Sequence, residues 1–142
     1  MVLHEQIDVR HFYDRWGPTV LRFCQLYLGD VDHAESATRE AFVEFFKGAS
    51  DLKGDKLPIA LWRLAVKASR SRCVVLDQGN GPKGFGSCVR LLPCQQRYVF
   101  LLKGTLGLTA QEVAETTNTT LSDVKQLWVE ALKSLRRLWL KR

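Results

Sequence analysis

Three cationic side chains in the first half of the chain are spaced so that they could bind phosphate groups. Arg63, Lys67 and Arg70 lie at offsets of four and seven, which stacks them into one ridge on a helix. No acidic residue lies within one helical turn of this ridge along the sequence, so its positive charges repel one another without relief. The ridge is either a solvated helix face or a surface whose charge an external anion satisfies.

A second cationic surface is predicted near the C-terminus. Between Leu121 and Leu138, apolar residues recur at alternating spacings of three and four, which predicts a long helix with one buried stripe. The opposite side of this helix carries Lys125, Gln126, Lys133 and Arg137. A polar, cationic helix of this kind is what a helix-turn-helix inserts into the major groove of DNA.

The residues around the start of this helix predict how it is positioned. Thr109 with Glu112 fits a capping box that begins a short preceding helix. Asn118 falls where the chain must turn, and Asn tolerates a left-handed backbone better than any residue except Gly. Thr120 with Asp123 repeats the cap and begins the long helix. These features predict a helix-turn-helix over residues 109–138, with an ordinary helical hairpin as the alternative.

A third group of residues combines charges with aromatic rings. Residues 32–46 are predicted to form a helix with an inward stripe of mostly small side chains, Ala34, Ala37, Ala41 and Phe45. Glu35 and Arg39 lie on another face, with Phe42 and Phe46 nearby. Aromatic rings beside charges form either a half-exposed rim or a docking surface for a partner. The residues alone favour the rim.

The remaining helices are predicted from apolar periodicity and from proline and glycine. Residues 5–28 are helical in pattern, but Gly17-Pro18 interrupts them and predicts a kink or a restart. Pro58 begins a helix that runs to about Val75 and carries the ridge. Pro93 begins another, which Gly104 ends.

The domain organisation follows from the segments without helical pattern. Residues 47–57 are predicted to form a loop, and the glycine-rich residues 77–90 a flexible linker. No strand-like alternation is found in the sequence, which predicts an all-α protein. We expect two small helical domains, residues 1–76 and 91–142, joined by the linker.

The distribution of charge points to nucleic acid as a partner. The net charge is +6, and hydrophobic residues make up 46% of the chain, enough for a folded core. Residues 1–76 hold 11 Lys and Arg against 10 Asp and Glu, whereas residues 77–142 hold 10 against 5. The basic second half is therefore where nucleic-acid affinity is expected.

The cysteines show no metal-binding pattern. Cys24, Cys73, Cys88 and Cys94 include no C-x-x-C pair, and no histidine is close to them in sequence, so no zinc site is expected. We expect free thiols in a reducing cytoplasm, rather than metal ligands or redox sensors. No apolar run is long enough for a membrane span, so no membrane insertion is expected.

The order of these features resembles an extracytoplasmic-function (ECF) sigma factor, a bacterial transcription-initiation subunit. Residues 33–46, HAESATREAFVEFF, are similar to the family's polymerase-docking pattern H/D-A-E-D-L-x-Q-E-x-F. Residues 61–72, LWRLAVKASRSR, resemble the helix that faces the downstream promoter element. Residues 91–138 match L-P-x-x-x-R-x-V-F…G-x-S-x-x-E-I-A…V-K-S-R…L, which is the most specific of the three matches.

The resemblance implies a role for each surface and names the partners, core RNA polymerase and promoter DNA, with an anti-sigma factor as a further partner. Polymerase docking is expected at Glu35, Ser36, Arg39, Glu40 and Phe42. The downstream promoter element is expected at Arg63, Lys67 and Arg70, with residues 47–57 accepting an unstacked base during melting. The upstream element is expected at Thr120, Ser122, Asp123, Lys125, Gln126, Lys133 and Arg137. Arg97 and Arg136 are expected to contact the DNA backbone or nothing.

Two rival functions remain open at this point. Ser36, Ala37 and Arg39 depart from the family pattern, as expected of a sigma-like DNA-binding regulator that does not engage polymerase productively. Glu130 and the aromatic residues of 32–46 instead suit a protein-interaction module such as a decoy for an anti-sigma factor. An enzyme is not expected, because no nucleophile–base set, carboxylate pair or metal-ligand spacing is found, and no cofactor is implied.

Overall fold

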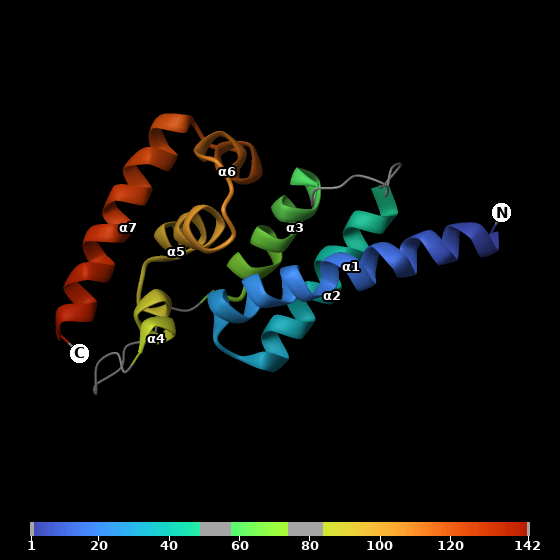
Figure 1. The fold of residues 1–142 in the computed structure, drawn as a ribbon, viewed down its shortest axis with the longest axis horizontal. Helices are drawn as coiled ribbons and strands as arrows, with labels where there is room; N and C mark the ends of the chain where they lie inside the picture. The colour runs from blue at the N-terminus through green and yellow to red at the C-terminus, as the bar shows by residue number, and fades with distance from the viewer. Residues whose placement is uncertain (1, 49–57, 74–83, 142) are drawn as a thin grey trace.

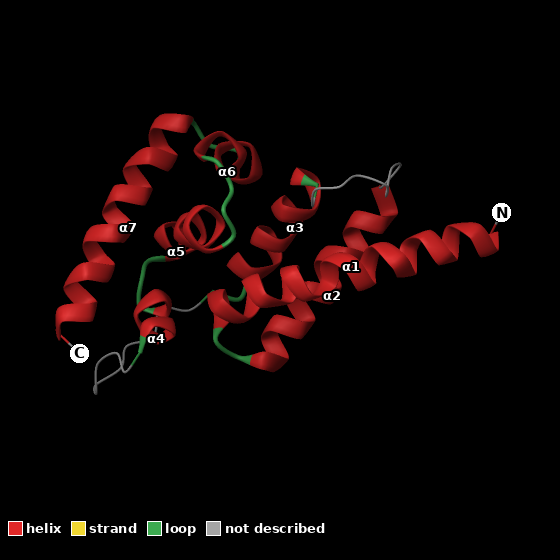
Figure 2. Ribbon diagram, in the orientation of Figure 1, coloured by secondary structure: helices red, strands yellow, loops and turns green. Residues whose placement is uncertain are grey.

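A computed structural model describes residues 2–48, 58–73 and 84–141 of the chain. Within these ranges every regular element is helical and no strand occurs (Figure 2), which confirms the prediction of an all-α protein. The helices form two groups that lie side by side (Figure 1). We call α1–α3 the N-terminal bundle and α4–α7 the C-terminal bundle.

The N-terminal bundle consists of α1 (Val2–Leu28), α2 (Val31–Gly48) and α3 (Ile59–Arg70), each packed on the other two. Its core contains the predicted small stripe of α2, which lets the helices approach closely, together with Phe12, Phe23 and Trp62. Gly29 has φ +77, a backbone conformation that favours glycine, and ends α1.

Two predictions for the N-terminal bundle need correction. α1 contains Pro18 within a single helix from Val2 to Leu28, so of the two predicted alternatives, a kink or a restart, the restart does not occur. Proline removes one helical hydrogen bond, but α1 is packed on both sides of Pro18, with Phe12 against Phe42 of α2 and Phe23 against Trp62 of α3. α3 ends at Arg70, five residues before the predicted end. Residues 47 and 48 of the predicted loop belong to α2, and residues 49–57 lie outside the described residues.

The C-terminal bundle consists of α4 (Phe85–Arg90), α5 (Cys94–Phe100), α6 (Ala110–Thr117) and α7 (Leu121–Lys141). A π-helical turn, η1 (Leu101–Thr105), extends α5. Phe100 stacks on Trp128 of α7 with ring centroids 5.8 Å apart, and Val124, Ala131 and Leu135 complete the buried stripe of α7. The long last helix therefore packs against α5 through one face only.

The helix-turn-helix begins and turns as predicted. The Thr109 hydroxyl accepts a hydrogen bond from the Glu112 amide, and the Glu112 carboxylate accepts one from the Thr109 amide, which completes the capping box. Asn118 has φ 55 and ψ 45 in the left-handed region. The Asp123 amide donates to the Thr120 hydroxyl at 3.1 Å and caps α7.

The predicted linker is shorter than expected at its C-terminal end. Residues 85–90 form α4, whose Cys88 and Val89 are completely buried, and α4 contacts both α1 and α7. Glycine content alone suggested a flexible segment here, but tertiary packing of these two side chains offsets the entropy of ordering the backbone. Residues 77–83 of the linker lie outside the described residues.

The expectation of four free thiols is wrong for one pair. Cys73, which follows α3, and Cys94, at the start of α5, form a disulfide across 21 residues of sequence, with Cα atoms 6.4 Å apart. The two bundles bring these residues together, and their spacing in sequence carries no signal of that approach. Cys24 and Cys88 are free and buried.

Candidate nucleic-acid interface

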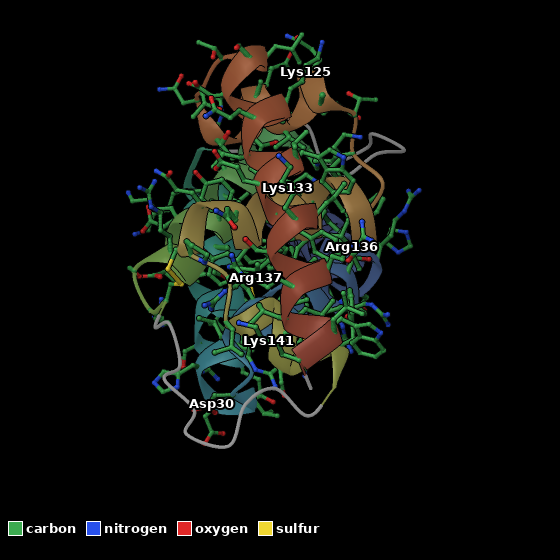
Figure 3. The ribbon with its side chains drawn as sticks, turned by 90° about the vertical axis from the view of Figure 1, so that its left-hand side faces the viewer. Asp30, Lys125, Lys133, Arg136, Arg137 and Lys141 are labelled. Atoms are coloured by element: carbon green, nitrogen blue, oxygen red, sulfur yellow. A yellow bond between two sulfur atoms is a disulfide. The ribbon has the colours of Figure 1, made fainter. Side chains whose placement is uncertain are left out.

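The outer face of α7 is open to solvent. Lys125, Gln126, Lys133 and Arg137 are all exposed. Figure 3 shows the cations of α7 along its outward side, from Lys125 near one end to Lys141 near the other. The buried stripe and this outward face are on opposite sides of one helix, so α7 satisfies the geometric requirement for insertion into a groove.

The N-terminal end of α7 presents its own polar groups. Thr120, Ser122 and Asp123 are exposed and lie beside the left-handed turn at Asn118. The first turn of a recognition helix is the part that reaches base edges in a helix-turn-helix. The structure therefore brings together six of the seven residues predicted for the upstream element near the exposed start and middle of α7, with Arg137 farther along the same helix.

One contact on α7 opposes DNA binding. The Gln126 side-chain amide donates to the Glu130 carboxylate at 3.2 Å. This contact occupies a side chain that could read a base edge, and the Glu130 carboxylate lies five residues after Lys125 on the same helix.

The cationic ridge faces the C-terminal bundle. Arg63, Lys67 and Arg70 are exposed on α3, but the Arg63 Nε donates to the backbone oxygen of Glu115 on α6 at 2.7 Å. That oxygen belongs to the last turn of α6, where the helix dipole is negative and attracts a cation. One cation of the ridge is thus satisfied from within the chain.

All three cations of the ridge border a groove between the bundles. The groove has a volume of about 420 Å³, and its walls are α3 on one side and the turn after α6 on the other. It is lined by Arg63, Lys67, Arg70, Tyr98, Thr116 and Asn118, among others. The Arg70 guanidinium lies 6.0 Å from the centre of the Tyr98 ring. In this arrangement the ridge lies opposite a protein wall, which restricts the approach of a DNA duplex.

Four of the five predicted polymerase-docking residues lie on the surface of α2. Glu35, Arg39 and Glu40 are exposed, and Ser36 is half-buried. Arg39 donates to the Ser36 hydroxyl at 3.4 Å, and Glu40 forms an ion pair with Arg72 of the segment after α3 at 2.8 Å. Glu35 and Arg39 also border a groove of about 410 Å³ between α1 and α2. These side chains are accessible to a partner.

Phe42 does not belong to this surface. It is 2% exposed, with its ring centroid 4.7 Å from that of Tyr13 and 6.2 Å from that of Phe12 on α1. The sequence favoured an aromatic rim and the family resemblance a docking role, and for Phe42 the structure contradicts both. α1 covers the edge of the small-residue stripe, so the face that carries Phe42 is buried as well.

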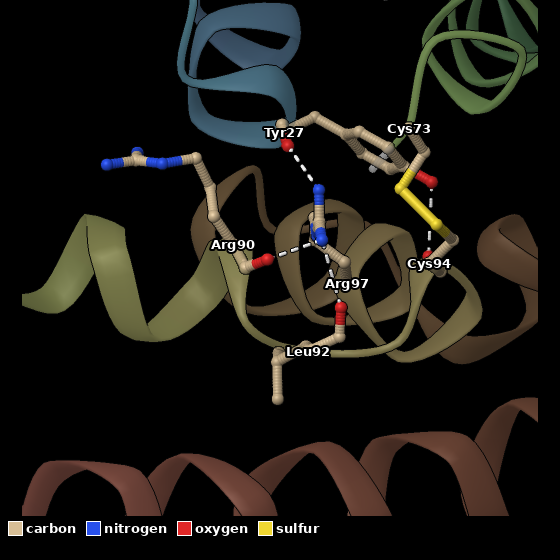
Figure 4. Close-up of a disulfide and its surroundings, with 6 residues drawn as sticks. All are labelled: Tyr27, Cys73, Arg90, Leu92, Cys94 and Arg97. Carbon is tan, nitrogen blue, oxygen red and sulfur yellow. Dashed lines mark hydrogen bonds between the residues drawn. A yellow bond between two sulfur atoms is a disulfide. The ribbon is translucent and has the colours of Figure 1, made fainter. Parts of the chain in front are cut away.

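Arg97 has a role that sequence reasoning missed. It is 1% exposed, and its guanidinium donates to the backbone oxygens of Tyr27 at 2.8 Å, Leu92 at 3.0 Å and Arg90 (Figure 4). Burial lowers the pKa of Arg97 and raises the pKa of Tyr27. Arg97 therefore joins the two bundles and does not contact DNA. Its position directly before the apolar run from Tyr98 to Leu102 was the available signal.

Metal binding and membrane insertion find no support in the described part of the chain. No group of three or more His, Cys, Asp or Glu side chains lies close enough to hold a metal ion there. Among the same residues, no helix combines the length and apolarity needed to cross a bilayer.

Most of the helix-turn-helix lies within a part of the chain that matches a known protein family. Residues 85–135 match the model of the family described as sigma-70, region 4. The ECF RNA polymerase sigma factor SigK from strains of Mycobacterium bovis and Mycobacterium tuberculosis is 26% identical over 161 residues, covering 94% of this chain and 86% of SigK.

A solved structure is similar over almost the whole chain. It is the sigma factor RpoE from Bartonella quintana in complex with the anti-sigma factor NepR. The TM-score is 0.73 at 15% sequence identity, covering 93% of this chain and 96% of that one. The likeness extends over both bundles and concerns the fold.

Proposed function

We propose that this chain is an extracytoplasmic-function sigma factor, which directs core RNA polymerase to specific promoters through two domains with separate tasks. The observation that carries the proposal is the exposed polar face of α7 within a capped helix-turn-helix. A helix of this kind, anchored by one apolar face, can enter the major groove with its N-terminal end.

The C-terminal domain would bind the upstream promoter element. We place its start at α4, because the match to sigma-70 region 4 begins at residue 85 and α4 packs against α7. Ser122, Asp123, Lys125 and Gln126 would reach base edges and nearby phosphates, while Lys133 and Arg137 would contact the DNA backbone.

The N-terminal domain would dock on polymerase and hold the downstream element. The exposed Glu35, Arg39 and Glu40, together with the half-buried Ser36, form a polar surface on α2 that suits docking. The ridge on α3 would bind phosphates of the downstream element once the C-terminal bundle has moved away from it. Binding energy from strand contacts would offset the cost of unpairing bases, so the mechanism needs no catalytic residue and no cofactor.

The place of action and a regulatory partner follow from the same proposal. The chain would act in the cytoplasm, where it meets polymerase and the chromosome. Its fold is similar to that of a sigma factor bound to an anti-sigma factor, which supports an anti-sigma factor as a partner here too.

Transcription in vitro with core polymerase and a set of candidate promoters tests this function.

Lys125→Ala and Gln126→Ala should each lower affinity for the recognised promoter by about fivefold or more, because a good base contact contributes about 1–3 kcal/mol. Affinity for random DNA should fall less. Lys141→Ala, at the far end of α7, is the matched control and should change both affinities by less than about twofold.

Two results would contradict the proposal. Binding of core polymerase without any promoter-specific transcript would show that the chain is not a productive initiation factor. Equal losses on specific and random DNA for Lys125→Ala and Gln126→Ala would show that these side chains contact phosphates only.

A further inference from the structure

The disulfide between Cys73 and Cys94 connects the two bundles at the point where they are also held by buried hydrogen bonds. Cys73 follows the helix that carries the ridge, and Cys94 begins the helix that leads to the helix-turn-helix. Close to it, the Tyr27 hydroxyl donates to the Cys94 backbone oxygen at 3.1 Å, and Arg97 donates to the Tyr27 oxygen (Figure 4). A covalent bond here fixes α3 relative to α5.

The closed arrangement restricts the approach of a duplex to the ridge. Arg63 binds the end of α6, and the wall formed by Thr116 and Asn118 lies across the groove from Lys67 and Arg70. We therefore expect the ridge to be fully available to DNA only once the bundles have moved apart. While the disulfide is intact, the 20 residues between the two cysteines cannot act as a tether between them.

The two linked cysteines differ from the other two in accessibility. Cys73 and Cys94 are half-buried, so a small thiol or disulfide can reach them, whereas Cys24 and Cys88 are completely buried. Disulfides in a reducing compartment are usually transient and redox-sensing. Oxidation would therefore act selectively on the pair that controls the arrangement of the bundles.

We propose that Cys73 and Cys94 form a reversible oxidation site that locks the two domains closed when oxidised and releases them for promoter binding when reduced. The inference rests on the proposed function. The oxidant is a low-molecular-weight disulfide of the glutathione type, and the reductant is a dithiol.

The chemistry is thiol–disulfide exchange. One protein thiol loses its proton and its sulfur attacks the external disulfide, whose S–S bond breaks and releases one thiolate, which takes up a proton. The second protein thiol then attacks the mixed disulfide, forms the Cys73–Cys94 bond and releases the second external thiol. Two protein thiols are oxidised by two electrons, and the external disulfide is reduced to two thiols. A dithiol reverses both steps.

The full-length chain, oxidised with glutathione disulfide or reduced with dithiothreitol, provides the test. Mass spectrometry after trypsin digestion without reductant should find peptide 73–83 linked to peptide 91–97 in the oxidised sample. Reduction should raise promoter-specific transcription by core polymerase about tenfold or more, because a locked chain does not contribute to the binding-competent fraction. It should also increase the radius of gyration measured by small-angle X-ray scattering.

Two double variants test whether the redox response depends on Cys73 and Cys94. Cys73→Ser/Cys94→Ser should give the same amount of transcript under oxidising and reducing conditions, equal to that of the reduced parent chain. Cys73→Ala/Cys94→Ala is a second variant of the same pair and should behave in the same way. Cys24→Ala/Cys88→Ala, which keeps the linked pair, should retain the full redox response. A redox response that persists in Cys73→Ser/Cys94→Ser would overturn the proposal.

The scattering measurement separates this inference from the proposed function. If oxidised and reduced chains have the same radius of gyration, the lock is refuted even if both transcribe. If reduction expands the chain but no form yields a promoter-specific transcript, the lock stands and the proposed function fails. Equal transcription by the oxidised and reduced parent chain would refute control of promoter binding.

Discussion

At the scale of single residues, one buried cation helps to join the two bundles. Arg97 donates to the backbone oxygens of Tyr27, Arg90 and Leu92. A planar guanidinium with several donors suits three separate carbonyl groups, and a lysine ammonium cannot reproduce that geometry.

Substitution of Arg97 should destabilise the fold. Arg97→Met leaves three carbonyl groups without this donor and should lower the free energy of unfolding by about 3 kcal/mol. Arg97→Lys keeps the charge but makes fewer hydrogen bonds, so its loss should be about half as large. Urea denaturation followed by circular dichroism measures both. Arg22→Met, at an exposed position of α1, is the control and should change stability by less than about 0.5 kcal/mol.

Asp30 predicts a pH dependence of stability. Hydrogen bonds from His33 and from the Asp32 amide hold the pKa of the Asp30 carboxyl below its ordinary value. The folded state therefore binds a proton less readily than the unfolded state. The stabilising contribution is complete above about pH 4 and is lost as the pH falls through the lowered folded-state pKa.

Asp30→Asn tests this, because Asn retains the capping ability without the charge. The variant should unfold at a lower temperature than the parent chain at pH 7, and the difference should shrink steadily below pH 4. Thermal melts at a series of pH values measure it. A difference that stays constant down to pH 2 would show that ionisation of Asp30 does not stabilise the fold.

At the scale of elements, α7 combines an anchoring face with a reading face. Its buried stripe packs on α5, and its outward side is open, but Glu130 holds Gln126 and adds a negative charge. The same helix therefore carries both attraction and repulsion for DNA.

Removal of the Glu130 charge should strengthen DNA binding. Glu130→Gln should raise affinity for duplex DNA about threefold at low salt, with a smaller gain as salt screens the repulsion. Fluorescence anisotropy with a labelled duplex measures the effect. Glu44→Gln, which removes an exposed carboxylate from α2, serves as the control and should leave affinity unchanged. An unchanged affinity for Glu130→Gln would place this residue outside the DNA interface.

At the scale of the whole molecule, the relation between the bundles decides which surfaces are available. The outer face of α7 is exposed in the closed arrangement, whereas the ridge on α3 faces α6. Upstream and downstream contacts should therefore respond differently to charge changes in the ridge.

Reversal of the charges of the ridge should separate upstream DNA binding from promoter opening. The triple change Arg63→Glu, Lys67→Glu and Arg70→Glu should leave upstream DNA binding within about twofold but reduce promoter opening about tenfold or more, because carboxylates repel the phosphates. Permanganate footprinting measures opening. Reversal of Arg10, Arg22 and Lys47, three exposed cations elsewhere, should have little effect on opening. Unchanged opening in the ridge variant would exclude the ridge from the mechanism.

The sequence by itself determined most of the helices, the caps and the turn, with α4 as the exception. The capping box at Thr109, the left-handed Asn118 and the buried stripe of α7 depend on residues three or four apart, and such local interactions are visible in one dimension. The all-α class and the exposed reading face of α7 follow from the same short-range pattern.

Only the tertiary structure decided the contacts between distant segments. Phe42 is buried by α1, residues 85–90 are ordered by α1 and α7, and Cys73 lies beside Cys94 through the docking of two bundles. Arg97 serves that docking instead of DNA. Helical periodicity marks a face as apolar or polar, but the partner that covers the face depends on the packing of segments tens of residues apart.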